Sequence, residues 1–170
     1  WQTSWGVSTR LVGALIMSHG DDSGLRLPPR VAPIQVVIIP ISIGEWKESV
    51  LPMARNIKDE LSQAGVRVKL DDREEFTPGW KFSDWEMRGV PLRLELGPRD
   101  IKENQVIAVR RDTREKKAVG LSSLKGKVPE ILEDIQKSLY QEALRLQADN
   151  TYEAGNYEEF KSIIESKRGF

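Results

Sequence analysis

The 170 residues include 39% hydrophobic and 31% charged side chains, a composition typical of a soluble globular protein and not of a disordered or fibrous chain. The 26 basic and 26 acidic residues cancel, so no overall field draws the chain to DNA, and any nucleic-acid contact is expected to be local. The absence of cysteine and the single His19 argue against a metal or redox centre. No apolar run approaches the roughly 20 residues of a membrane span, so we expect a cytoplasmic protein.

The first 32 residues form a short piece that has no core of its own. Residues 1–8 are expected to be an extended lead-in, and Gly20 to end a short buried helix with apolar positions at Leu11, Val12, Leu15, Ile16 and Met17. The stretch His19–Asp22 invites a metal interpretation, but a turn whose carboxylates accept from backbone amides is favoured. The prolines that follow mark a domain boundary, which we place between residues 32 and 33.

From residue 33 the pattern changes to that of an α/β domain. The β-branched run 34–41 predicts a strand buried on both faces, interpreted as the central strand of a parallel sheet. Helical spacing over 47–64 ends at Gly65, and alternation over 66–70 predicts a second strand. These three segments predict a βαβ unit.

The rest of the domain, to residue 151, adds a short helix, three strands and a long helix. Residues 80–88 are expected to be helical, with Trp80 and Trp85 as core anchors. Residues 91–96 alternate apolar and charged side chains, 105–109 and 116–121 form a hairpin, and apolar residues recur at helical spacing over 128–146. The predicted fold is therefore α/β, with a mixed five-stranded sheet flanked by helices.

Residues 152–170 are predicted to begin a C-terminal extension. Asn156 and Glu159 have the spacing of a capping box for a last helix. That helix has little to pack against, so we expect it to dock on another part of a larger protein.

The stretch from Trp1 to Arg10 has a pattern that suits a nucleotide. A glycine permits close approach to the backbone, hydroxyl side chains follow it, and Arg10 brings a planar charged group to the start of a helix. On spacing alone, an arginine paired with a carboxylate elsewhere is the commoner arrangement.

Residues 1–33, with Leu11–Met17 and His19–Arg30, resemble motif 3 and the end of the catalytic domain in prolyl-tRNA synthetases of the archaeal and eukaryotic type. The resemblance implies that Arg10 is the catalytic residue that stacks on or clamps ATP and that Ser8 contacts the nucleotide. It also implies that Trp5 and Gly6 line the aminoacyl-adenylate pocket.

A second set of motifs, at 71–73, 77–82, 85–93 and 97–100, resembles the anticodon-binding domain of class IIa synthetases and is closest to the prolyl enzyme. Proline anticodons share two guanines, and reading guanine in a splayed loop needs both acceptors and donors. The resemblance implies acceptors at Glu86 and Asp100 and donors or phosphate contacts at Arg93 and Arg99. Charge and stacking would come from the neighbouring Lys81 and Phe82.

Alternatives remain for these residues. Glu86, Arg93 and Glu95 could form an ordinary solvated charged face, although we favour a function for Arg93. The glycine spacing of a dinucleotide fold, a Gly-rich phosphate loop and a catalytic triad are all missing from the sequence.

The resemblance implies a C-terminal part of proline-tRNA ligase, an enzyme that uses ATP and magnesium to activate proline and transfers it to proline tRNA. The whole enzyme would be a homodimer. The motif 2 arginine, the proline pocket and the dimer interface would lie before Trp1, so this stretch alone is predicted to be inactive and to bind no cofactor. The alternatives are a free-standing RNA-binding accessory module and an interaction domain with no RNA role.

Overall fold

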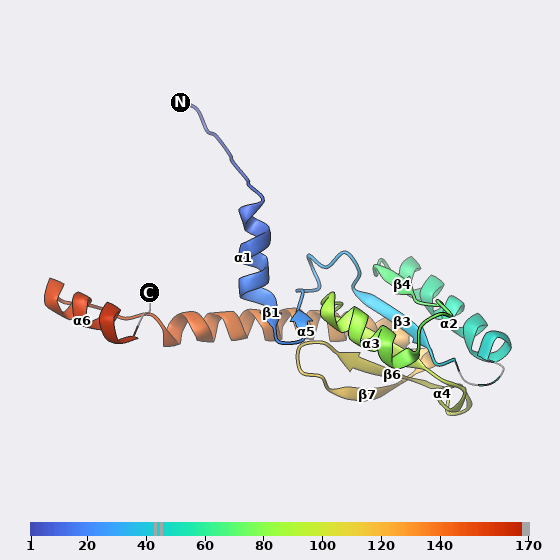
Figure 1. The fold of residues 1–170 in the computed structure, drawn as a ribbon. Helices are drawn as coiled ribbons and strands as arrows, with labels where there is room; N and C mark the ends of the chain where they lie inside the picture. Colours follow the sequence, from blue (N-terminus) through green and yellow to red (C-terminus); the bar gives the residue numbers. More distant parts are fainter. Residues whose placement is uncertain (43, 45, 168–170) are drawn as a thin grey trace.

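A βαβ unit organises the first half of the domain. The computed structural model describes residues 1–42, 44 and 46–167 (Figure 1). Strand β3 (Val36–Pro40) is buried at every residue, as its β-branched run predicts, and helix α2 (Trp46–Gln63) leads to strand β4 (Val68–Leu70), which pairs parallel to β3. Gly65, with φ of +82°, reverses the chain between helix and strand, a conformation that favours glycine.

Three further strands complete the sheet in the order β4-β3-β5-β6-β7. Strand β5 (Leu92–Leu96) runs parallel to β3, and the hairpin of β6 (Gln105–Arg110) and β7 (Lys116–Gly120) adds two antiparallel strands beyond it. The predicted mixed five-stranded sheet is confirmed. The prediction that the first strand is central was wrong, because the hairpin extends the sheet beyond β5 and makes β5 the middle strand.

The two faces of the sheet are covered differently. Helices α2 and α5 (Leu124–Asp149) pack on the face that carries Leu92, Leu94 and Leu96, and this layer holds the larger core. A smaller cluster lies on the opposite face, where Val37 and Ile39 pack beneath α3 (Pro78–Met87). Two short elements complete the connections: α4 (Pro98–Lys102) joins β5 to β6, and the 3-10 turn Leu121–Ser123 joins β7 to α5.

One predicted core anchor is on the surface instead. Trp85 is buried in the cluster under α3, as expected, but Trp80 is 44% exposed. Trp80 lies in the first turn of α3, at the margin of the side that buries Lys81, Asp84 and Trp85, and its ring stacks on Phe76 outside the core.

Helix α1 (Arg10–His19) forms where a helix was predicted and Gly20 follows it, but no residue in it is buried. Its apolar side chains Leu11, Val12, Ile16 and Met17 are exposed, because the helix projects away from the sheet (Figure 1). The expectation of a buried helix was therefore wrong in this structure.

The hairpin of β1 (Gly20–Asp21) and β2 (Gly24–Leu25) joins this arm to the domain. The Leu27 N–H donates to the Gly89 carbonyl at 3.2 Å, and the Asp21 carboxylate accepts from the Ser23 N–H at 2.9 Å, as the predicted turn requires. Asp21 also forms a two-pronged ion pair with Arg111, at 2.9 and 2.6 Å, which the sequence did not indicate. These contacts hold the β1–β2 hairpin against the residues around α3 and β6.

The C-terminal helix α6 (Tyr157–Lys167) lies beyond the end of α5 (Figure 1). The Asn156 side chain accepts from the Glu159 N–H at 2.9 Å, whereas Glu159 accepts from Gly155 and not from Asn156. Only half of the predicted capping box therefore forms. No described helix combines the length and the apolarity needed to cross a membrane.

Candidate nucleic-acid interface

The face of the sheet that carries Val37 and Ile39 and is partly covered by α3, called the outer face below, carries a row of charged side chains. Alternation along β5 turns Arg93 and Glu95 away from the leucines, and β7 adds Lys116. Arg93 donates to Glu95 through Nε at 3.0 Å, with Nη2 2.9 Å from the same oxygen, and the Lys116 Nζ lies 3.6 Å from the other carboxylate oxygen. The Arg93 and Glu95 side chains are only 13% and 12% exposed, so this row is not a freely solvated face.

Helix α3 places an aromatic ring and a carboxylate beside this row, one turn apart. The Arg93 guanidinium carbon lies 4.4 Å from the centroid of the Phe82 ring. The Glu86 carboxylate lies 3.5 Å from Arg114 Nε, so it too has a cationic neighbour. Glu86, Arg93, Arg114 and Lys116 are among the residues that line one cavity of about 220 Å³. Two of the residues predicted from the sequence, Glu86 and Arg93, therefore line the same cavity. Glu86 can accept hydrogen bonds there, and Arg93, Arg114 and Lys116 can donate them.

Lys81 is placed differently from what its predicted role requires. The side chain is 1% exposed, and its Nζ donates to the Asp71 carbonyl at 3.3 Å. It lies on the buried side of α3 with Trp85, so in this structure its charge is internal and is not presented to a ligand.

Arg99 and Asp100 lie at another edge of the sheet. They belong to α4, which follows the carboxyl end of β5, whereas Glu86 lies near the end of α3, just before that strand begins. The Asp100 Oδ2 accepts from the Gly97 N–H at 2.7 Å and so caps its own helix, while Arg99 is exposed. The structure therefore separates the predicted anticodon residues into two groups.

A buried ion-pair network, not predicted from the sequence, supports the start of α3. Asp71 accepts from Arg73 through Nε at 2.8 Å and Nη2 at 2.7 Å, and from Trp85 Nε1 at 2.6 Å. Arg73 also donates to Asp84 at 3.1 Å. Burial alone would raise the pKa of Asp71, but the hydrogen bonds from Arg73 and Trp85 outweigh it and lower the pKa to about 2. The Asp71 carboxylate therefore stays ionised, and together with Asp84 it fixes the guanidinium of Arg73.

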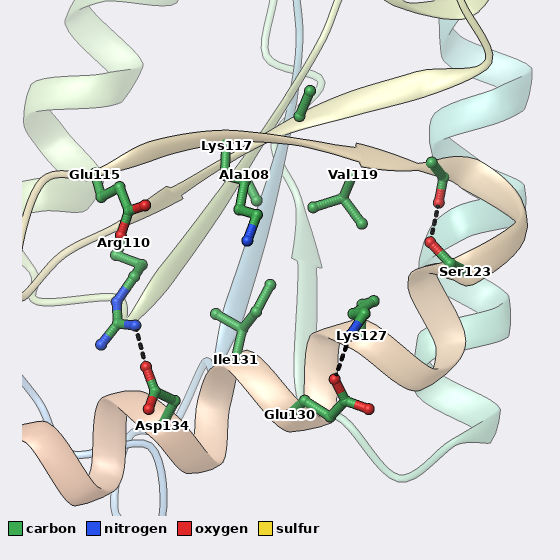
Figure 2. A pocket seen from close by; sticks show the side chains of 12 residues that line it. Ala108, Arg110, Glu115, Lys117, Val119, Ser123, Lys127, Glu130, Ile131 and Asp134 are labelled. Carbon is green, nitrogen blue, oxygen red and sulfur yellow. Dashed lines mark hydrogen bonds and ion pairs between the residues drawn. The ribbon is translucent and has the colours of Figure 1, made fainter.

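A larger cavity, of about 460 Å³, lies between the β6–β7 hairpin and α5 (Figure 2). Apolar side chains, among them Val119 and Ile131, line it together with two ion pairs, Arg110 with Asp134 and Lys127 with Glu130 at 2.7 Å. It contains none of the predicted site residues. The charged side chains Glu115 and Lys117 also line it.

The predicted nucleotide-binding residues are not enclosed. Trp5, Gly6, Ser8 and Arg10 are all exposed, and no atom comes within 4 Å of a Cβ built on Gly6. The Arg10 N–H donates to the Ser8 hydroxyl at 3.4 Å, which starts α1. The described residues therefore do not enclose them, and no three acidic or histidine side chains of the described part of the chain are grouped so that they could hold a metal ion.

The sheet order, the α3 cover and the polar outer face define an α/β domain of the anticodon-binding class. Residues 35–131 match the family described as "Anticodon binding domain", and the chain belongs to that family. The predicted fold class is thereby confirmed.

The full chain is similar to curated proline-tRNA ligases. It is 53% identical over 169 residues to the enzyme of Natranaerobius thermophilus. The aligned residues make up 99% of this chain and 35% of the relative. It is 56% identical over 169 residues to that of Ruminiclostridium cellulolyticum, covering 99% and 34%, and 51% identical over 170 residues to that of Rubrobacter xylanophilus, covering 100% and 36%. The chain spans about a third of the length of these relatives. The predicted resemblance to prolyl-tRNA synthetases is confirmed, and the archaeal and eukaryotic type stays a prediction.

Proposed function

We propose that this chain is the anticodon-reading part of a cytoplasmic proline-tRNA ligase and that it binds proline tRNA through the outer face of its sheet. The observation that carries the proposal is the shared cavity that Glu86 and Arg93 line beneath α3. Similarity to ligases of that name along 99% of the chain supports the choice of tRNA.

The side chains of this cavity match the hydrogen-bonding groups of guanine. The Glu86 carboxylate can accept from guanine N1–H and N2–H, and the Arg93 guanidinium can donate to O6 and N7. In the free protein each is held by another charge, Glu86 by Arg114 and Arg93 by Glu95. Binding would exchange these partners for the base, so the ion pairs keep the side chains ordered beforehand.

Arg99 and Asp100 are proposed to contact a second part of the anticodon loop. Asp100 uses Oδ2 for the cap on Gly97, which leaves Oδ1 free to accept from a base. Arg99 is exposed and can reach either a base edge or a phosphate. We leave Lys81 out of the RNA contacts and assign it to the support of the loop that holds Asp71.

The activation of proline is assigned to the whole enzyme, with ATP and magnesium as its substrate and cation and a homodimer as its expected assembly. Residues 1–32 would supply Arg10 and Ser8 to the ATP and Trp5 and Gly6 to the adenylate pocket. Residues 33–151 would read the anticodon, and 152–170 would begin a further domain. Because none of the residues that the structure describes encloses Arg10, we expect no proline-dependent pyrophosphate exchange from this chain.

The test is the affinity of the 170-residue chain for a proline anticodon stem–loop and for the same RNA with both guanines changed to adenine. The native RNA should bind more tightly, and Arg93→Ala should weaken native binding by roughly 1–3 kcal/mol, the value of a good base contact. Arg93→Lys keeps the positive charge but lacks the planar guanidinium group with its paired N–H donors. It should therefore recover only part of the lost affinity.

Arg145→Ala is the matched control, because Arg145 is exposed on α5 and carries the same charge. It should change the affinity little. Equal binding of the two RNAs would refute anticodon reading and favour an unspecific RNA-binding module, and no RNA binding at all would favour an interaction domain.

A further inference from the structure

An aromatic pair lies on the surface at the start of α3. The rings of Phe76 and Trp80 are stacked, with centroids 3.8 Å apart and planes inclined by 12°. Trp80 is 44% exposed although Phe76 already covers part of its indole. Burying a tryptophan side chain is energetically favourable, so an exposed one is a candidate contact surface. In this pair the exposed part of the indole is available for stacking with another ring.

The pair is held in place from within the domain. The Arg73 guanidinium carbon lies 4.9 Å from the Phe76 ring centroid and 5.3 Å from that of Trp80. Arg73 is itself fixed by the carboxylates of Asp71 and Asp84. Thr77 caps the helix, since its hydroxyl accepts from the Trp80 N–H at 3.3 Å. The rings are thus part of an ordered surface, which lowers the entropic cost of binding.

The fold places this pair at the same edge of the sheet as Arg99. Strands β4 and β5 both run parallel to β3, so their carboxyl ends meet at one edge, and the loop to α3 and helix α4 both start there. The nearby side chains Asp72 and Glu75 are exposed and acidic and would repel a phosphate, and Arg73, the cation beside the rings, is already paired with Asp71 and Asp84. The chemistry therefore suits the flat face of a base and not the nucleic-acid backbone.

We propose that Phe76 and Trp80 form a stacking platform for an unpaired base of the anticodon loop and that they bind this base without reading its identity. The inference rests on the proposed function. Proline anticodons share two guanines but differ in the remaining base, and a contact with that base has to tolerate every nucleotide. Stacking on an aromatic ring meets this requirement, because every base has a π-face.

The experiment compares Trp80→Ala and Trp80→Phe in the full chain, with three stem–loop RNAs that keep both guanines. One carries the native variable base, one another base, and one an abasic site. For the unmodified protein we expect equal affinity for the first two RNAs and about tenfold weaker binding of the abasic one. Trp80→Ala should bind all three at the weaker level, and Trp80→Phe should retain most of the affinity.

Two readouts distinguish base stacking from a phosphate contact and from a loss of folding. The effect of Trp80→Ala should be the same at 50 and 200 mM salt, since stacking releases no counterions, whereas a phosphate contact would depend on salt. An unchanged melting temperature shows that the variant is folded, as expected for a side chain outside both cores.

The possible failures are distinguishable. If Trp80→Ala binds every RNA as tightly as the unmodified protein while guanine is still preferred, the platform is refuted and anticodon reading stands. A base preference at the variable position that disappears in Trp80→Ala would also overturn the inference, because the platform would then be reading that base. If the unmodified protein does not prefer guanine, both proposals fail.

Discussion

Replacing Asp71 by asparagine should destabilise the domain, and the loss should depend on pH. Asp71 is 2% exposed and accepts three hydrogen bonds from the side chains of Arg73 and Trp85. An asparagine keeps one acceptor but removes the charge that balances the buried side of Arg73. Removing one partner of a buried pair costs roughly 3–5 kcal/mol. Because Arg73 is partly exposed and keeps Asp84, we expect about 2–3 kcal/mol at pH 7.

The pH dependence follows from the lowered pKa of Asp71, about 2 against an ordinary 3.8. A carboxyl group whose pKa is lower in the folded state stabilises the protein above its unfolded pKa. That contribution is lost as the pH falls through the folded value. The difference corresponds to about 2 kcal/mol, and about half of it should be gone by pH 3. The stability gap between the two proteins should therefore narrow between pH 4 and pH 2.

The assay is urea unfolding followed by tryptophan fluorescence at pH 7, 4 and 3. Asp72→Asn is the matched control, since Asp72 is the exposed neighbour of Asp71 and should change stability by less than about 0.5 kcal/mol. A gap for Asp71→Asn that stays constant from pH 7 to pH 3 would refute the assignment of the stabilisation to the ionised carboxylate.

Three other substitutions test the fold and the contact between the β1–β2 hairpin and the sheet. Gly89→Ala should destabilise by more than about 2 kcal/mol in thermal unfolding, because φ is +73° and a new Cβ would lie 2.6 Å from Leu25. Gly126→Ala, whose Cβ meets nothing within 4 Å in α5, should be neutral or stabilising by about 0.5 kcal/mol. Arg111→Gln should release Asp21 and increase hydrogen exchange at residues 20–25. Unchanged exchange there would show that the ion pair between Arg111 and Asp21 does not hold the β1–β2 hairpin.

Periodic patterns predicted most of the domain. Alternation along β5 correctly separated Leu94 from Arg93 and Glu95, because in a strand successive side chains point to opposite faces. The β-branched run of β3 likewise predicted burial on both faces. The position of β3 in the sheet could not be read from its own residues, since strand order depends on where the later hairpin pairs.

The orientation of α3 was harder to predict because its pattern is weakly amphipathic. A tryptophan lies outside and Lys81 inside, so residue type alone assigns both to the wrong side. Lys81 is tolerated because its Nζ reaches a backbone carbonyl, a partner that no side-chain motif reveals. Similarly, the pairing of Asp21 with Arg111 joins charges far apart in sequence, which local spacing does not indicate.

For the candidate site, the resemblance supplied the residues and the structure supplied their grouping. Glu86 and Arg93 lie at one cavity, as a common role requires, whereas Arg99 and Asp100 lie at another edge. The exposure of Trp80 could not be predicted from the sequence, because a tryptophan in a short helix is usually a core residue.

Arg111 makes the positions of Glu86 and of the β1–β2 hairpin mechanically dependent on each other. Its guanidinium grips the Asp21 turn, and its Nε donates to the Glu86 backbone carbonyl at 3.0 Å. Glu86 is the residue proposed to accept from guanine. A displacement of its backbone when RNA binds must therefore either carry the Asp21 turn with it or break hydrogen bonds of Arg111. The Arg111 side chain thus couples the position of Glu86 to the position of the N-terminal helix α1, which carries Arg10.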